Sequence, residues 1–151
     1  MSDVPFTPLL INGEHQPAST GATFSVHNPY NGSFASTAAA ASLEDCRAAI
    51  EAAQRAFPAW EATGYTTRRN ILLRAAATLE SEEWQKKAAV AMRAELAMPQ
   101  EPIMFNFSAG SGLLASVATL VNDLRGETLP SLVPGGQVFI QRRAQGVMYV
   151  S

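Results

Sequence analysis

The sequence predicts an α+β fold with N-terminal antiparallel strands, about four packed helices and a C-terminal β hairpin. Three observations carry this prediction. Residues 1–41 contain short alternating apolar runs separated by Asn-Gly and Asn-Pro turns. Residues 42–125 repeat apolar side chains at helical spacing, and residues 126–151 return to short apolar runs. We therefore expect a single domain, residues 1–151, made of these three parts.

The extended part contains three candidate strands. Residues 9–11 form an apolar run before Asn12-Gly13, a strong tight-turn pair. Residues 23–27 alternate with period two and end at Asn28-Pro29, because the residue before proline favours an extended backbone. A third run, residues 34–40, follows Asn31-Gly32. These runs predict a small antiparallel β unit.

The first helix is predicted to begin at a capping box formed by Ser42 and Asp45. The serine oxygen accepts a backbone N–H, and the acid suits the positive end of the helix. Pro58 is expected to end or kink this helix. Its predicted inner face comprises Leu43, Cys46, Ile50, Ala53 and Phe57.

Three further helices are predicted by periodicity and capping. The second covers residues 67–80, and its inward side chains are Ile71, Leu72, Ala75 and Leu79. Ser81 is expected to cap the third helix, over residues 82–96. The fourth follows Pro99 and Pro102 and ends near residues 124–126. Its predicted buried stripe comprises Leu113, Val117, Leu120, Val121 and Leu124.

The last part is predicted to form a β hairpin. Residues 137–143 and 146–150 flank a short turn at Ala144-Gln145-Gly146. Gly146 supplies the positive φ angle that such a turn requires.

Composition and charge limit the classes of function. A chain of 151 residues is long enough to bury roughly 70% of its unfolded surface. The net charge of −2 provides no electrostatic footprint for nucleic acid or an anionic membrane. We expect no stretch long enough to span a bilayer, and no secretory signal at the N-terminus. With one cysteine, the sequence predicts a soluble cytoplasmic protein without internal disulfides.

A glycine-rich segment in the fourth helix allows two interpretations. Residues 110–115 fit the dinucleotide fingerprint G-x-G-x-x-A, with residues 103–107 as a preceding strand. Asp123 or Glu127 would then replace the ribose-binding acid. However, residues 125–130 do not form the second parallel strand that a βαβ unit needs. Small residues at a close helix contact produce the same pattern.

The remaining candidates for chemistry are isolated. His15 and His27 lack further ligands at metal spacing, so we predict no metal site. Arg142 and Arg143 are expected to be solvated or ion-paired, and Cys46 is expected to be a structural, buried thiol. No serine elbow, phosphate loop or acid pair forms a standard catalytic arrangement.

Several segments together resemble one enzyme family. They are residues 10–14, residues 24–29 with Gly32, residues 48–60, Arg68 and Arg69 with residues 71–79, and residues 126–131. These segments are similar to the N-terminal part of the NAD(P)-dependent aldehyde dehydrogenase superfamily, in particular its salicylaldehyde and vanillin branch. The resemblance covers nearly the whole chain but about the first third of a family member.

The resemblance implies that residues 105–124 form one helix with a face toward the substrate tunnel. Phe105, Ala109 and Leu113 match that face and are the candidate substrate-binding residues; close helix packing is the alternative for all three. The family's catalytic asparagine, cysteine and glutamate, and most of its Rossmann sheet, would lie after Ser151. We therefore expect a truncated chain with no bound NAD, no dehydrogenase activity of its own, and no assignable catalytic residue.

Three hypotheses for function remain open. The chain is a repurposed protein that binds, or converts without redox chemistry, an aromatic or aldehyde-type metabolite. It is instead an oligomerisation module, because the family strands that match residues 137–150 join subunits, which predicts a homo-oligomer formed through the C-terminal hairpin. The third reading is an inactive fragment. Departures from the family at Ala144-Gln145 and residues 95–102 favour altered function over a random break.

Overall fold

The computed structural model describes residues 5–150. Its elements confirm the predicted α+β class. The helices are α1 (Leu43–Glu61), α2 (Tyr65–Glu80), α3 (Glu82–Leu96) and α4 (Gln100–Leu120), the last followed by a 3-10 turn, η1 (Val121–Asp123). The strands are β1 (Phe6–Thr7), β2 (Leu9–Ile11), β3 (Glu14–Gln16), β4 (Thr23–His27), β5 (Phe34–Ala39), β6 (Glu127–Pro130) and β7 (Gln137–Ile140).

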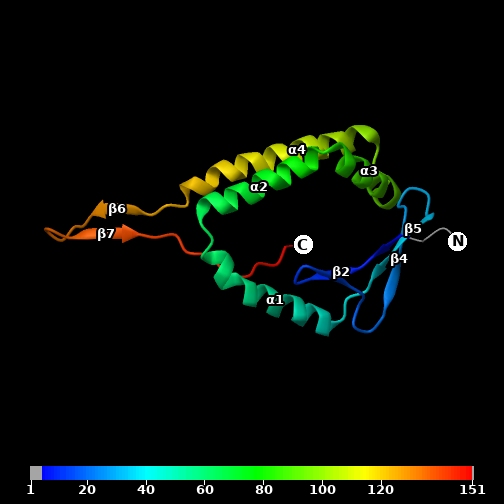
Figure 1. Cartoon of the computed structure of the whole chain (residues 1–151), viewed down its shortest axis with the longest axis horizontal. Coiled ribbons are helices and arrows are strands. Elements are labelled where there is room, and N and C mark those ends of the chain that lie inside the picture. Colours follow the sequence, from blue (N-terminus) through cyan, green and yellow to red (C-terminus); the bar gives the residue numbers. More distant parts are fainter. Residues whose placement is uncertain (1–4, 151) are drawn as a thin grey trace.

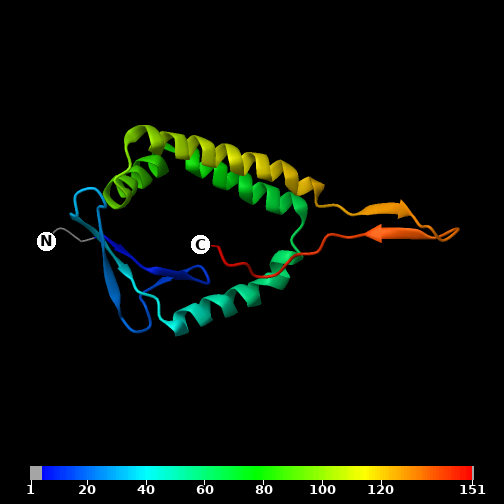
Figure 2. The ribbon, with the colours of Figure 1, turned by 180° about the vertical axis from the view of Figure 1, so that it is seen from behind.

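The elements surround an opening instead of filling a centre. Helices α2 and α4 lie side by side along one side of it, and α1 lies along the other (Figure 1). The N-terminal strands close one end, and the β6–β7 hairpin projects from the opposite end. Beyond β7, residues 141–150 turn back past the end of α1 into the opening, as the reverse view also shows (Figure 2).

The N-terminal strands form two small sheets. The three predicted extended runs correspond to β2, β4 and β5. Strands β4 and β5 pair antiparallel, but β1 joins the other edge of β5 in parallel. Strands β2 and β3 pair antiparallel across Asn12-Gly13, whose φ angles of 55° and 80° are those of a tight hairpin turn.

Helix α1 begins with the predicted capping box. The backbone N–H of Asp45 donates to Ser42 Oγ at 3.1 Å, and that of Ser42 donates to Asp45 Oδ2 at 2.8 Å. The expectation that Pro58 ends or kinks the helix is wrong as to its end, because the helix continues to Glu61. Proline removes its own N–H donor and its ring crowds the carbonyl four residues earlier, but the helix has only one further turn after Pro58.

The predicted inner face of α1 is mostly wrong, since only Phe57 among its five residues is half-buried. Leu43 and Ile50 are 69% and 52% exposed, and the Cys46 thiol is exposed. Asp45 and Ala52 are buried instead. The N-terminal segment and the β2–β3 hairpin contact this other face, through hydrogen bonds from Ser19 N–H to the Asp45 carboxylate and through β2 beside α1. Within residues 5–150, most of the predicted apolar face of α1 is exposed.

The core lies where α3 and α4 meet. Ile103 is fully buried, and Phe107 is 4% exposed beside Ala89. Three of the side chains around this cluster are Ala88, Met92 and Met98. On α2, the predicted inward residues Ile71, Leu72, Ala75 and Leu79 are half-buried.

The predicted buried stripe of α4 is mostly wrong. Leu113, Leu120 and Leu124 are 66%, 58% and 42% exposed, Val117 is 40% exposed, and only Val121 is buried. The buried face of α4 instead comprises Ile103, Phe107, Ser111 and Ala118. These include small and polar side chains, which let α4 approach α2 closely; a methyl group on Gly110 would touch Leu79 at 3.4 Å.

A C-terminal hairpin is present, and the predicted strand over residues 137–143 is confirmed in part by β7, but the predicted second strand over residues 146–150 is wrong. Strand β7 pairs antiparallel with β6, from Glu127 opposite Ile140 to Pro130 opposite Gln137. Hydrogen bonds from Ser131 N–H to the Gly136 carbonyl and from Gly136 N–H to the Val133 carbonyl close the turn. The turn therefore pairs β7 with β6, the strand before it, and residues 141–150 form no strand.

Helix α4 also corrects the expectation about membrane spans. Together with η1 it is long and apolar enough to cross a bilayer, by length and composition alone. Residues 102–122 carry no charged side chain. The prediction missed this segment because Asn, Ser and Thr interrupt its apolar residues. Core helices of soluble proteins meet the same criterion.

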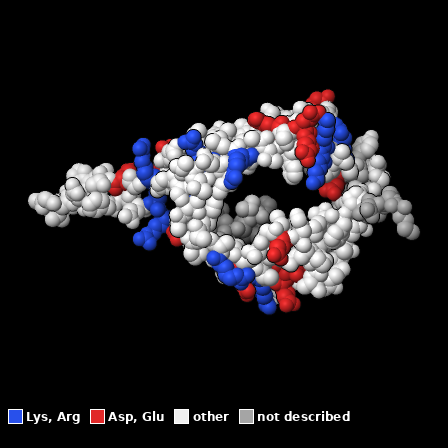
Figure 3. Space-filling view, in the orientation of Figure 1, with Lys and Arg blue, Asp and Glu red and all other residues white. Residues whose placement is uncertain are grey.

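The structure exposes far more surface than a compact protein of its size. Its accessible surface is 11577 Å², whereas a compact monomer of 16.1 kDa exposes about 7,400 Å². An unfolded chain of this mass exposes about 23,000 Å², so folding buries roughly half of it, less than the 70% expected from length. The opening is visible as a hollow in the space-filling view, with charged side chains of both signs on its rim (Figure 3).

Candidate functional site

The three candidate substrate residues share one face of α4. Phe105, Ala109 and Leu113 follow each other at four-residue spacing, which aligns them along a helix. Phe105 and Leu113 are 71% and 66% exposed, and Ala109 is exposed. The structure therefore brings the three together as an open stripe. Such exposure does not correspond to the wall of an enclosed cavity.

The stripe faces away from the core because of helical geometry. Ile103, Phe107 and Ser111 are buried on the opposite face of α4, two positions from each candidate. Two positions correspond to about 200° around a helix. The small side chain of Ala109 leaves space between Phe105 and Leu113 along the stripe. What the described chain offers there is an apolar surface open to a ligand or to another polypeptide.

The glycine-rich segment lies inside α4. Residues 103–107 are helical, so the strand that a dinucleotide loop requires is not there. Gly110 lies next to Leu79 of α2, whereas a methyl group added at Gly112 would contact no other atom. The backbone N–H groups of both positions lie within a continuous helix, where carbonyl groups of the preceding turn accept them. The helical interpretation is confirmed.

The histidines and the cysteine lie apart from one another. His15 and His27 are exposed on β3 and β4, and the His27 ring meets the Phe34 ring edge-on at 6.0 Å. Cys46 lies near the start of α1. Within residues 5–150, no three His, Cys, Asp or Glu side chains gather in a way that would hold a metal ion.

The Asp45 carboxyl group has a pKa that is shifted by its hydrogen bonds. The hydrogen bond from the Ser42 backbone N–H lowers the pKa of Asp45 below its ordinary value of 3.8. Burial opposes this shift, and hydrogen bonds from the Ser42 hydroxyl and from Ser19 add to it. The carboxylate is fully used in holding the N-terminal segment to α1, so its role is structural.

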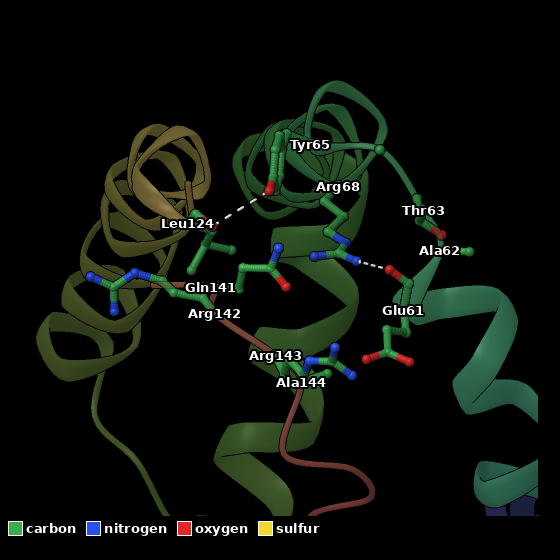
Figure 4. Close-up of a pocket in the computed structure, with 11 residues that line it drawn as sticks. Glu61, Ala62, Thr63, Tyr65, Arg68, Leu124, Gln141, Arg142, Arg143 and Ala144 are labelled. Carbon is green, nitrogen blue, oxygen red and sulfur yellow. Dashed lines mark hydrogen bonds between the residues drawn. The ribbon is translucent and has the colours of Figure 1, made fainter. Parts of the chain in front are cut away.

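A pocket of about 610 Å³ lies between α1, α2 and the segment after β7 (Figure 4). Sequence reasoning missed it, because its walls come from segments far apart in the chain. Arg142 and Arg143, expected to be solvated or ion-paired, line it together with Arg68. Further lining residues are Glu61, Ala62, Thr63, Gly64, Tyr65, Leu124, Gln141 and Ala144.

Arg68 holds one side of this pocket. Its Nη2 donates to the carbonyl oxygens of Trp60 and Glu61 at 3.1 and 2.6 Å, at the end of α1, where the last carbonyls lack partners in a following turn. The Trp60 carbonyl also accepts the Thr63 backbone N–H. The guanidinium lies 5.8 Å from the centre of the Trp60 ring. Its Nε is buried and has no hydrogen-bond partner within residues 5–150. Tyr65 Oη donates to the Leu124 carbonyl at 3.4 Å, which ties α2 to the end of η1.

Comparison with known proteins places the chain in a family. The model of the aldehyde dehydrogenase family matches residues 15–150. A vanillin dehydrogenase of Pseudomonas fluorescens is 38% identical over 141 residues, which cover 93% of this chain and 29% of that protein. A salicylaldehyde dehydrogenase of Pseudomonas putida is 30% identical over 125 residues, which cover 83% of this chain and 26% of that protein.

Solved structures agree with these relatives. The structure of a salicylaldehyde dehydrogenase from Pseudomonas putida G7, complexed with salicylaldehyde, superposes with a TM-score of 0.86 at 27% identity. The superposed part covers 92% of this chain and 28% of the salicylaldehyde dehydrogenase chain. An NAD-dependent benzaldehyde dehydrogenase from Corynebacterium glutamicum superposes with a TM-score of 0.78 at 26% identity. The superposed part covers 89% of this chain and 29% of that chain.

The resemblance in the sequence is thus confirmed over most of the chain, which spans less than a third of the length of these relatives. The matched part includes α4 and the β6–β7 hairpin. This chain belongs to the aldehyde dehydrogenase family.

Proposed function

We propose that this chain is an assembly module of aldehyde dehydrogenase type, which pairs with a second copy of itself or with a longer aldehyde dehydrogenase. The observation that carries the proposal is the accessible surface of 11577 Å², about 4,000 Å² above that of a compact monomer. Interfaces of obligate complexes bury roughly 2,000–5,000 Å² in total, which is about 1,000–2,500 Å² on each chain. The excess surface of this chain is therefore more than enough to supply one side of a permanent interface.

The β6–β7 hairpin is the element best suited to such pairing. All residues of both strands are exposed, among them Val138, Phe139 and Ile140 at 44%, 69% and 43%. Each strand pairs along one edge only, because the sheet has two strands. Open edges with apolar side chains pair with strands of another chain. This supports a homo-oligomer joined through the hairpin.

Light scattering coupled to size-exclusion chromatography tests the pairing. At micromolar concentration, we expect a mass of two or more chains, either alone or after mixing with a longer aldehyde dehydrogenase. Phe139→Glu should shift the species toward the monomer, because it places a charge in the apolar contact. Gln137→Glu is the matched control, since it adds the same charge at an exposed polar position. A monomeric mass under both conditions would refute the proposal.

A second candidate function is binding of an aromatic or aldehyde-type metabolite at Phe105, Ala109 and Leu113. The stripe is apolar and accessible, and relatives include proteins named vanillin and salicylaldehyde dehydrogenase. On this proposal the chain alone does not bind NAD or oxidise aldehydes. It holds the metabolite or promotes a non-redox isomerisation, cyclisation or dehydration, for which positioning accounts for much of the rate.

Calorimetry with vanillin and salicylaldehyde tests this second function. We expect saturable heat from the wild type and its loss in Leu113→Asp, which places a charge on the stripe. Leu43→Asp is the matched control, since Leu43 is equally exposed, at 69%, but lies on α1. Equal heats in the two variants would argue against a site on α4. Micromolar affinity for NAD would overturn the expectation of NAD-independence.

A further inference from the structure

The pocket beside Arg68 concentrates positive charge. Three guanidinium groups and one carboxylate, Glu61, are among its lining residues. The protein as a whole carries a net charge of −2, so this concentration runs against the composition. Arginine stays charged at any physiological pH and presents planar, forked donors that match carboxylate and phosphate oxygens.

The side chains that surround the pocket include unused hydrogen-bond donors. In Figure 4 the Arg68 guanidinium lies between Gln141 and Glu61, and the Arg143 side chain lies below it on the segment after β7. Arg68 Nη2 donates to the carbonyls of α1, but the buried Nε of Arg68 has no hydrogen-bond partner within the described chain. Because this Nε has almost no exposed surface, Arg68 contributes mainly its fixed positive charge to the pocket, and Arg143 is the donor available to an oxyanion.

We propose that this pocket binds a small oxyanion, a carboxylate or a phosphate group, held by Arg68 and Arg143. Arg68 is oriented in advance by the α1 carbonyls and by the Trp60 ring, so little side-chain entropy is lost when the anion binds. Gln141, on the segment after β7, provides a neutral amide donor beside Arg68 (Figure 4). The site is independent of the β6–β7 pairing and of the α4 stripe.

Titration of the full chain with inorganic phosphate and, separately, with benzoate tests the site. Ionic strength is held constant with sodium chloride, and the NMR resonance of Arg68 Nε–H reports on the site directly. We expect saturable binding of at least one anion, accompanied by a shift of that resonance. Binding of phosphate alone assigns a phosphate ligand, and binding of benzoate alone assigns a carboxylate.

Arg143→Gln is the decisive variant, because Arg143 makes no contact that supports the end of α1. Loss of a charged hydrogen bond should weaken binding about tenfold to a hundredfold. Arg74→Gln removes the same charge from an exposed position of α2 outside the pocket, and should leave affinity unchanged. Failure of both anions to saturate, an unmoved Arg68 resonance, or equal weakening in the two variants would overturn the proposal.

Discussion

At the scale of single residues, a few polar contacts hold segments that the small core does not reach. Asp45 accepts hydrogen bonds from the backbone N–H groups of Ser19 and Ser42, and Ser19 Oγ lies 2.9 Å from Ser42 Oγ. Farther along, the Asn28 side-chain amide donates to the carbonyls of Arg93 and Ala94 near the end of α3. Side chains thereby link the N-terminal strands to two separate helices.

Replacing Ser42 by alanine should destabilise the fold by about 0.5–2 kcal/mol, because the first turn of α1 loses its side-chain cap. Urea unfolding followed by circular dichroism measures the difference. Ser116→Ala is the control: its hydroxyl bonds the Gly112 carbonyl within exposed α4, where alanine is a better helix former. Equal losses in both variants would show that the cap at Ser42 carries no special weight.

The lowered pKa of Asp45 predicts a dependence of stability on pH. The folded state favours the charged carboxylate, so its contribution to the free energy of unfolding is present above pH 3.8, the ordinary value. It is lost as the pH falls below 3.8 through the folded-state pKa. The stability difference between wild type and Asp45→Asn should therefore shrink in that window. A difference that stays constant down to the acid transition would contradict this assignment.

At the scale of elements, α4 has two contrasting faces. One bears Ile103 and Phe107 and forms the core with α3, whereas the other presents Phe105 and Leu113 to solvent. A soluble helix usually shows solvent a polar face. On α4 the exposed face bears the apolar side chains of Phe105 and Leu113, which is the arrangement expected of a surface that meets a ligand or another polypeptide.

Truncation on the two faces of α4 should have unequal effects. Ile103→Ala removes a fully buried side chain and should cost about 2–5 kcal/mol of stability. Leu113→Ala, at a position 66% exposed, should change stability by less than about 0.5 kcal/mol. Chemical denaturation of the isolated chain compares them. A large loss from Leu113→Ala would mean that its face is buried in solution, and would itself be a sign of association.

At the scale of the whole molecule, stability is unevenly distributed. Helices α3 and α4 share the buried cluster and α2 lies along α4, while α1 and the β6–β7 hairpin extend away with most side chains exposed (Figure 1). Segments with few buried contacts open at lower free energy than the core. The open shape therefore predicts local unfolding at its ends well before the core unfolds.

Hydrogen exchange followed by mass spectrometry should reveal this gradient. Amides of α4 around Ile103 are expected to exchange slowest, and those of β6, β7 and residues 141–150 fastest. Addition of a partner that covers the hairpin should slow the second group selectively. Uniform protection in the isolated chain would contradict the open arrangement.

Much of the local structure was predictable because it depends on neighbouring residues. The capping box at Ser42, the cap at Ser81, the Asn12-Gly13 turn and the bounds of α3 follow from side chains a few positions apart. The candidate stripe on α4 was likewise placed on one helix face. Its ligand stays a prediction, because periodicity aligns side chains without saying what they meet.

The sequence by itself determined the family resemblance, the α+β class and the order of strands and helices, since these depend on local propensity and residue pattern. Only the tertiary structure decided which faces are buried, which strand β7 pairs with, and that Arg68 meets the segment bearing Arg143. Leu43, Cys46 and Leu113 were expected inside and lie outside. Burial depends on which surfaces meet in space. The apolar pattern identifies a face that another surface could cover, but it does not identify that surface.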